Sequence, residues 1–263
     1  MNETLESMMH AIFKSWFVDF DPVHSKAAGK NPAHMETETA ALFPNVFGDN
    51  GLPVGWKEEH LPNLIDYKEG PGIRNWQYTN SDEGIKFINI RCIKNRDLEL
   101  SNANRITEAE AYGKYAHFLL KEEDIVVSTS GTLGRFSFVR EEHLPLMLNT
   151  SVIRMRPIHK KTSREFLYAY LGSKEFQNEL EIRATGSAQK NFGPMHLNKM
   201  YLKVPNFEII NAYSKKTSSI VDKFLSNQKE NHTLAELRDT LLPKIMSGEI
   251  RVKDAEHEVE AAL

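Results

Sequence analysis

The feature that most constrains the fold is a long stretch without helix breakers near the C-terminal end. From Glu208 to Leu242 the sequence contains neither glycine nor proline, and apolar side chains recur every three or four residues. This spacing predicts one helix about 50 Å long, with a stripe that a single helix cannot bury alone. The positions of the stripe are Tyr213, Thr217, Ile220, Phe224, Asn227, Asn231, Leu234, Arg238 and Leu241.

The stripe has the spacing of a coiled-coil seam, although several positions are polar. Asparagine at a seam costs stability but specifies register and helix number, so Asn227 and Asn231 favour one particular pairing. The alternative is a helix packed along its own domain, with these polar residues facing water. Pro243 and Gly248 should end the helix and leave a fraying acidic tail at 249–263. We expect dimerisation through Tyr213, Ile220, Phe224, Asn227, Asn231, Leu234 and Leu241.

The two ends of the chain resemble each other. Aligning Asn2–Trp16 with Asn231–Ile245 makes Asn, Thr and Leu coincide and matches the apolar positions of the two segments. Both segments should therefore be amphipathic helices with one apolar face. Unrelated amphipathic helices also align in this way, and that alternative stays open.

The pattern changes twice between these helices. Residues 21–54 have scattered proline and glycine and little periodicity, which indicates an irregular connector. Residues 55–205 alternate short β-branched and aromatic runs with turn residues, and helical spacing intervenes at Glu108–Tyr115 and Ser163–Arg183. The expected fold class is α+β, a mixed α/β domain with a long α-helical coiled-coil arm.

No set of residues has the spacing of a catalytic or metal site. The histidines form no HExxH motif, and the single cysteine, Cys92, offers no zinc pair and no internal disulfide. The segments STSGTLGRF and GSAQKNFG lack the patterns of a nucleophile elbow, a dinucleotide loop and a phosphate-binding loop. We therefore assign no catalytic residue, metal or cofactor, and keep a self-contained DNA-modifying or cleaving enzyme as an alternative.

The sequence also has no membrane signature. No stretch approaches the roughly 18 consecutive apolar residues of a membrane helix, and the N-terminus lacks the pattern of a signal peptide. A single cysteine suits a reducing compartment. We expect a cytoplasmic protein.

The formal net charge of −3 hides an uneven distribution. Residues 1–60 and 249–263 together carry −8, whereas residues 61–248 have a surplus of +5. A mildly basic middle is compatible with DNA contact, because Lys and Arg neutralise phosphates, but it is also found in proteins that bind no nucleic acid.

Several loops in this middle region carry side chains that match base edges. Arg and Lys suit guanine, Asn and Gln suit adenine, and Ser or Thr hydroxyls bond phosphate oxygens. Polar loops are also polar simply because they are solvated, and this alternative stays open. The loops are GPGIRNWQY, FINIRCIKNRD, ATGSAQKNFGP and the hydroxyl-rich STSGTLGRF.

Four segments resemble the specificity subunits of type I restriction-modification systems. LAELRDTLLPKIMSGEIRV, at Leu234–Val252, is similar to the end of the conserved region that closes those subunits. NETLESMMHAIFKSWFVDFDPV, at Asn2–Val23, is similar to their central conserved region. KEEDIVVSTSGTLGRFSFV and ATGSAQKNFGPMHLNKMYLKVP resemble parts of their recognition domain. The chain therefore resembles the C-terminal half of such a subunit, with one target recognition domain instead of two.

The resemblance implies a domain organisation. Its parts are a helix of the central conserved region at 1–20, the connector at 21–54, the target recognition domain at 55–205, a conserved coiled-coil helix at 206–248 and the tail at 249–263.

The resemblance also implies a non-catalytic subunit that reads one half of a bipartite double-stranded DNA target. The implied partners are methyltransferase subunits that carry S-adenosylmethionine, a restriction subunit, and a second copy or another half-subunit. A coiled-coil scaffold without DNA contact is the other alternative. A DNA-reading role carries over to Arg74, Asn75, Asn89, Arg91, Ser130, Arg135, Gln189, Lys190 and Asn191.

Overall fold

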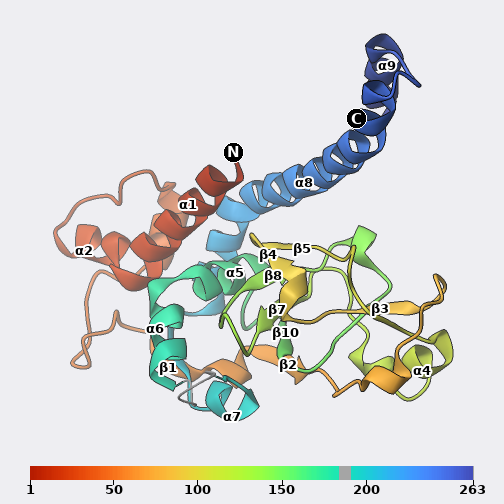
Figure 1. Cartoon of the computed structure of the whole chain (residues 1–263). Coiled ribbons are helices and arrows are strands. Elements are labelled where there is room, and N and C mark those ends of the chain that lie inside the picture. The colour runs from red at the N-terminus through yellow and green to blue at the C-terminus, as the bar shows by residue number, and fades with distance from the viewer. Residues whose placement is uncertain (184–190, 263) are drawn as a thin grey trace. The chain divides into compact units, whose positions relative to one another are not determined.

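The computed structural model describes residues 1–183 and 191–262 (Figure 1). It divides into two compact units. The central unit comprises Met8–Thr217, and the terminal unit comprises Met1–Ser7 with Ser218–Leu263. Helices and strands are mixed and a long helix lies near the C-terminus, so the expected α+β class is confirmed. None of the helices in the described residues is long and apolar enough to span a membrane.

The main sheet of the central unit is antiparallel. Val126, Val127 and Ile153 of its inner strands are fully buried, as β-branched residues in a covered sheet should be. Ile153 pairs with Val127 on one side and with Glu69 on the other. The strand order within the described residues is β2 (Ile65–Glu69), β10 (Val152–Pro157), β7 (Ile125–Ser128) and β8 (Phe136–Phe138).

Smaller sheets complete the β structure of this unit. They are β6 (Arg105–Ile106) with β3 (Ile85–Phe87) and β9 (Leu146–Met147), β4 (Ile93–Lys94) with β5 (Asp97–Leu98), and β1 (Lys57–His60) with β11 (Tyr201–Val204).

Helix α5 (Arg164–Gly172) packs against the main sheet. Tyr168 lies with its ring centroid 4.9 Å from that of Phe136 and 4.7 Å from that of Phe138. The helical spacing expected from Ser163 corresponds to α5 and α6 (Lys174–Arg183). Shorter segments are α4 (Glu108–Tyr112), α7 (Pro194–Leu197), and the 3₁₀ turns η2 (Leu61–Asn63), η3 (Asn75–Gln77), η4 (Ile90–Cys92), η5 (Ala116–Phe118) and η6 (Glu141–His143).

The segment at 21–54 is more regular than expected. Val23 and Phe43 are buried at 0% and 1% exposure, and Lys26 Nζ donates to the carbonyls of Ala40 and Phe43. Burial and these bonds stabilise helices that the scattered proline and glycine do not favour, so the expectation of a fully irregular connector was wrong. The helices in this segment are α2 (Asp21–Ala27) and α3 (Thr37–Leu42), and a π-helical turn, η1 (Lys14–Val18), precedes it.

An aromatic cluster in the central unit fixes the beginning of α8 (Phe207–Met246) beside the end of α1 (Asn2–Phe13). Tyr213 is fully buried, and its ring centroid lies 5.3 Å from that of Phe17 and 6.1 Å from that of Phe13. The Tyr213 hydroxyl donates to the Met9 carbonyl at 3.1 Å, and burial raises the pKa of Tyr213. The two helices therefore share one core in this unit.

One polar seam residue of the terminal unit, Asn227, forms its hydrogen bonds within the same chain. Asn227 Nδ2 donates to Asn2 Oδ1 at 2.8 Å, and Asn2 Nδ2 donates to the Phe224 carbonyl at 3.2 Å. Asn227 is 9% exposed, so little water reaches its amide group, and these hydrogen bonds supply the partners that water would otherwise provide.

The C-terminal end agrees with the expectation for Gly248 and differs from those for Pro243 and the tail. Helix α8 passes through Pro243, which was expected to end it, and stops before Gly248, whose φ is +76°. The tail, expected to fray, forms α9 (Val252–Ala262). Leu241 and Ala255 are 4% and 5% exposed and line one groove between α8 and α9. Burial of this apolar face offsets the backbone cost of proline and orders the tail.

Replacing Tyr213 tests the aromatic cluster. Tyr213→Ala removes a fully buried ring and should lower the free energy of unfolding of the central unit by about 3–5 kcal/mol. Tyr213→Phe removes only the hydroxyl that bonds Met9 and should cost about 1 kcal/mol. Urea unfolding followed by circular dichroism measures both, and equal small losses would show that the ring does not stabilise this unit.

Candidate nucleic-acid interface

The turn formed by Asn149–Ser151, directly before β10, connects two of the polar loops. The Ile73 amide donates to Asn149 Oδ1 at 3.2 Å, and the Thr150 amide donates to the Pro71 carbonyl at 2.9 Å. The Thr129 amide donates to the Ser151 carbonyl at 2.9 Å. This 149–151 turn therefore holds the 71–78 loop and the 129–135 loop at the same end of the main sheet.

Two further contacts bring the remaining described loop residues to the same place. Ser130 forms an antiparallel bridge with Asn191, and the Phe192 amide donates to the Thr129 carbonyl at 2.8 Å. Gly131 has a φ of +65°, and a Cβ on it would lie 2.9 Å from Ile90 Cδ1. The 129–135 loop thus lies against η4.

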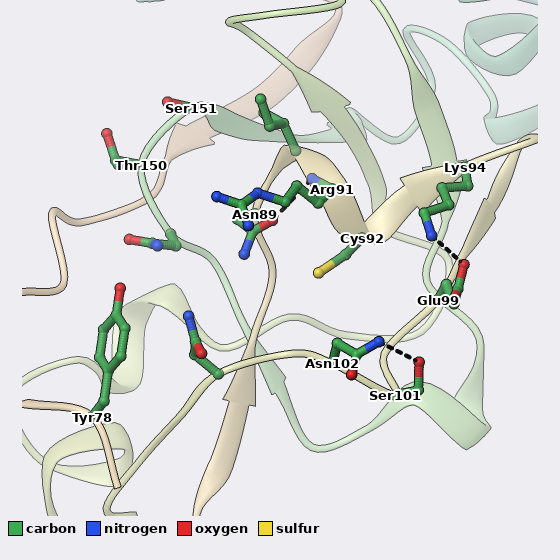
Figure 2. A pocket seen from close by; sticks show the side chains of 13 residues that line it. Tyr78, Asn89, Arg91, Cys92, Lys94, Glu99, Ser101, Asn102, Thr150 and Ser151 are labelled. Carbon is green, nitrogen blue, oxygen red and sulfur yellow. Dashed lines mark hydrogen bonds and ion pairs between the residues drawn. The ribbon is translucent and has the colours of Figure 1, made fainter. Parts of the chain in front are cut away.

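A pocket of about 570 Å³ lies between η4, the 149–151 turn and residues 101–104. Figure 2 shows Tyr78, Asn89, Arg91 and Thr150 around it. The polar side chains that line this recognition pocket belong to Tyr78, Asn89, Arg91, Lys94, Glu99, Ser101, Asn102, Asn104, Asn149, Thr150 and Ser151.

Two predicted DNA-reading residues, Asn89 and Arg91, lie in this pocket. Asn89 begins η4 as its N-cap, because its Oδ1 accepts from the Arg91 amide at 2.9 Å, which leaves the Asn89 amide group as a donor. The Arg91 side chain is exposed. Cys92 is buried, and burial raises the pKa of its thiol, so it stays protonated rather than acting as a nucleophile.

Two charged side chains of the pocket, Lys94 and Glu99, form an ion pair with each other. Lys94 Nζ lies 2.6 Å from Glu99 Oε2, and the bond to Lys94 lowers the pKa of Glu99. Both side chains are about half exposed, so this pair contributes little stability. The Arg91 guanidinium, by contrast, has no ion pair among the described residues.

Arg74 and Asn75 are exposed on the 71–78 loop, and a buried glutamine fixes the backbone beneath them. Gln77 Oε1 accepts from the Arg74 amide at 3.1 Å, and Gln77 Nε2 donates to Glu110 Oε1 at 2.9 Å and to the Tyr115 hydroxyl at 3.0 Å. The hydrogen bond with Gln77 lowers the pKa of Tyr115. Gln77 is therefore a structural residue of the loop rather than a ligand contact.

The other predicted DNA-reading residues differ in accessibility. Arg135 and Asn191 are exposed, whereas Ser130 is only 7% exposed beneath its bridge to Asn191. Gln189 and Lys190 lie outside the described residues. Of the predicted DNA-reading residues that the structure describes, only Asn89 and Arg91 line the recognition pocket, and the others lie on neighbouring loops.

Sequence reasoning missed the 149–151 turn and the asparagines of the 101–104 segment. The signals were present as NTS between two strand-like runs and as SNAN before β6. Asn104 is exposed and lines the pocket, where its amide can both donate and accept as adenine recognition requires. Among the described residues, no cluster of three or more His, Cys, Asp or Glu side chains has metal-binding geometry.

The residues predicted to pair two helices divide into buried and exposed positions. Tyr213, Phe224, Asn227 and Leu241 are at most 9% exposed, Ile220 is half-buried, and Asn231 and Leu234 are exposed. Beyond them, Leu242, Met246 and Val252 are exposed apolar residues of the terminal unit. Among the predicted pairing residues, the exposed ones therefore lie towards the C-terminal end of α8.

Comparison with known proteins adds independent evidence. A profile of the type I restriction modification DNA specificity domain matches residues 53–238. The chain is similar to the type I restriction enzyme HindI specificity subunit of Haemophilus influenzae, at 29% identity over 95% of this chain and 62% of that protein. It is 22% identical to the MjaIX specificity subunit of Methanocaldococcus jannaschii, over 96% of this chain and 54% of that protein. The chain thus spans between half and two thirds of the length of these relatives.

A solved structure agrees with the fold. The S subunit of a type I restriction-modification system from M. genitalium superposes with a TM-score of 0.50 at 18% identity, covering 78% of this chain and 49% of that chain. At this identity the likeness concerns the fold alone.

A substitution at Gly70 tests whether the 149–151 turn holds the 71–78 loop. A Cβ on Gly70 would lie 2.3–2.6 Å from backbone atoms of Asn149, whereas one on Gly72 would meet nothing within 4 Å. We expect Gly70→Ala to lower the free energy of unfolding by about 1–3 kcal/mol and to speed tryptic cleavage at Arg74. Gly72→Ala, the matched control, should change neither, and equal behaviour of the two variants would contradict the role of the turn.

Proposed function

The chain belongs to the type I restriction-modification DNA specificity family, and we propose that it reads one half of an interrupted DNA target without catalysing a reaction itself. The observation that carries the proposal is the joining of separate polar loops around the recognition pocket. Reading a base sequence requires donors and acceptors held at fixed spacing, because each base pair presents its own pattern in the major groove.

The exposed groups suit this task. Arg74, Arg91 and Arg135 are exposed, and the described residues offer no ion pair to their guanidinium groups. Arg reads guanine through two parallel bonds or neutralises a phosphate, and exposed carboxamides such as those of Asn75 and Asn104 suit adenine. The surplus of +5 at residues 61–248 favours the approach of DNA, whereas the acidic ends do not.

The proposal includes partners, because a subunit that recognises DNA without catalysing a reaction needs an enzyme to act at the recognised site. We propose methyltransferase subunits, which carry S-adenosylmethionine, and a restriction subunit in the complete complex. A chromosomal DNA ligand and a lone buried thiol at Cys92 favour a cytoplasmic location.

We further propose that two copies of this chain pair and present two identical readers. A two-fold symmetric protein pair implies a symmetric, interrupted target, whereas pairing with a different half-subunit implies an asymmetric one. The exposed positions Asn231, Leu234, Leu242 and Met246 favour contact through the end of α8, since Tyr213 and Asn227 already have partners in their own chain.

Methylome sequencing tests the reading function. The motif methylated in cells with the gene and its methyltransferase should disappear when the gene is deleted. Arg91→Ala should weaken DNA binding by about 1–3 kcal/mol and make one position of the motif degenerate. Lys161→Ala removes an exposed charge beyond the far end of β10 and serves as the control, with an unchanged motif. A motif that survives deletion would contradict the proposal, and the same motif with Arg91→Ala would exclude Arg91 as a reader.

The oligomeric state tests the pairing. Sedimentation of the 30.1 kDa chain, alone and with its methyltransferase, should give two copies per particle. Leu234→Asp should weaken association at least ten-fold, because it buries a charge in an apolar contact, whereas Thr240→Asp on an exposed position of the same helix should not. A strict monomer in both preparations would contradict the pairing.

A further inference from the structure

One large aromatic side chain of the 71–78 loop is turned towards solvent. Trp76 is 81% exposed, whereas the other two tryptophans, Trp16 and Trp56, are 4% and 6% exposed. A tryptophan side chain offers a large apolar area and is enriched where proteins bind other molecules. The exposed Trp76 indole therefore does not stabilise the fold by packing, and it is available to bind a ligand.

The structure beneath Trp76 is rigid. Trp76 is the middle residue of η3, and the following residue, Gln77, is 7% exposed and bonded to Arg74, Glu110 and Tyr115. The Tyr78 ring centroid lies 5.2 Å from that of Phe87. Neighbours on both sides thus hold the backbone that carries the indole, and little conformational entropy of this backbone remains to be lost on binding.

The position of Trp76 links it to the recognition pocket. Tyr78, two residues along the chain, lines that pocket, and the 149–151 turn holds the start of the same loop. Arg74 and Asn75 stand exposed directly before Trp76. Asp82 and Glu83 follow in the next turn, so the surroundings are polar and of mixed charge rather than apolar.

These surroundings favour a nucleobase over a protein surface. A protein contact of this kind would be a patch of several exposed apolar side chains. Among the described residues of 55–205, Ile73 in the same loop is buried, and the other exposed large apolar side chains lie outside that loop, at Tyr112, Ile182, Met195 and Tyr201. A lone aromatic ring among arginine and amide donors is the arrangement with which proteins stack on bases while bonding the backbone and base edges.

We propose that Trp76 contacts DNA by stacking its indole on a nucleobase at the edge of the half-site read by the recognition pocket. This inference rests on the proposed reading function. The stacked base is one whose neighbour has shifted away, because an intact base stack leaves no face free. Trp76 then adds affinity through apolar contact, whereas Arg91 and its neighbours discriminate between bases.

Binding measurements with the assembled complex test the inference. The probe is a labelled duplex that carries the methylated motif, and its dissociation constant is measured over a series of salt concentrations. Trp76→Ala should weaken binding about ten-fold and Trp76→Phe less. The salt dependence should stay the same, because stacking releases no counterions. Tyr112→Ala removes another exposed ring of the central unit and is the matched control, with unchanged affinity.

A spectroscopic readout locates the effect at the indole. With 5-hydroxytryptophan incorporated into this chain only, acrylamide should quench mainly position 76, because Trp16 and Trp56 are buried. Adding the duplex should reduce that quenching.

The outcomes distinguish failure of the stacking role of Trp76 from failure of the proposed DNA-reading function. If the duplex binds the wild-type complex without reducing the quenching at position 76, and binds Trp76→Ala equally well, the stacking role is overturned and the reading function stands. If Trp76→Ala instead loses the methyltransferase, Trp76 is a protein contact and the stacking role is again overturned. Failure of the wild-type complex to bind any duplex would overturn the reading function itself.

Discussion

The positions of the polar loops beside the recognition pocket depend on the 149–151 turn, and above all on the hydrogen bond from the Ile73 amide to Asn149 Oδ1. Asn149 is 7% exposed, so little water can replace this bond, and losing it would leave a buried polar group unpaired. Gly70 allows the approach, since any side chain there would collide with the Asn149 backbone. The loops on either side share this support, so a target meets one prearranged surface rather than separate flexible segments.

Chemically similar residues have opposite tasks in this structure. Gln77 and Asn149 use their amide groups inside the protein, whereas Asn75 and Asn104 expose theirs. The buried amides fix backbone positions to which the exposed groups are attached. Specificity of this kind needs both sets, because a donor that moves freely cannot distinguish base edges that differ in the position of one atom.

The sequence predicted elements that depend on local periodicity and missed those that depend on distant contacts. Residues from Glu208 onwards form the expected long helix, and Ser163–Arg183 is helical as predicted. The helix nevertheless passes Pro243, and the tail is ordered, because Ala255 and Leu241 are buried along one groove. Asn89 and Arg91 lie in the recognition pocket, but the polarity of the 71–78 loop gave no indication that Gln77 would be buried.

The sequence by itself determined the α+β class, the helical ends, and the segments rich in Arg, Asn and Gln that resemble the family. These properties follow from the spacing of residue types over a few turns, because local periodicity determines which face of a helix or strand is apolar. Only the tertiary structure decided that Asn149 gathers loops separated by many residues, that Tyr213 and Asn227 bond within their own chain, and that Trp76 stays exposed. Such outcomes depend on which groups burial brings together, and spacing along the chain carries no information about that.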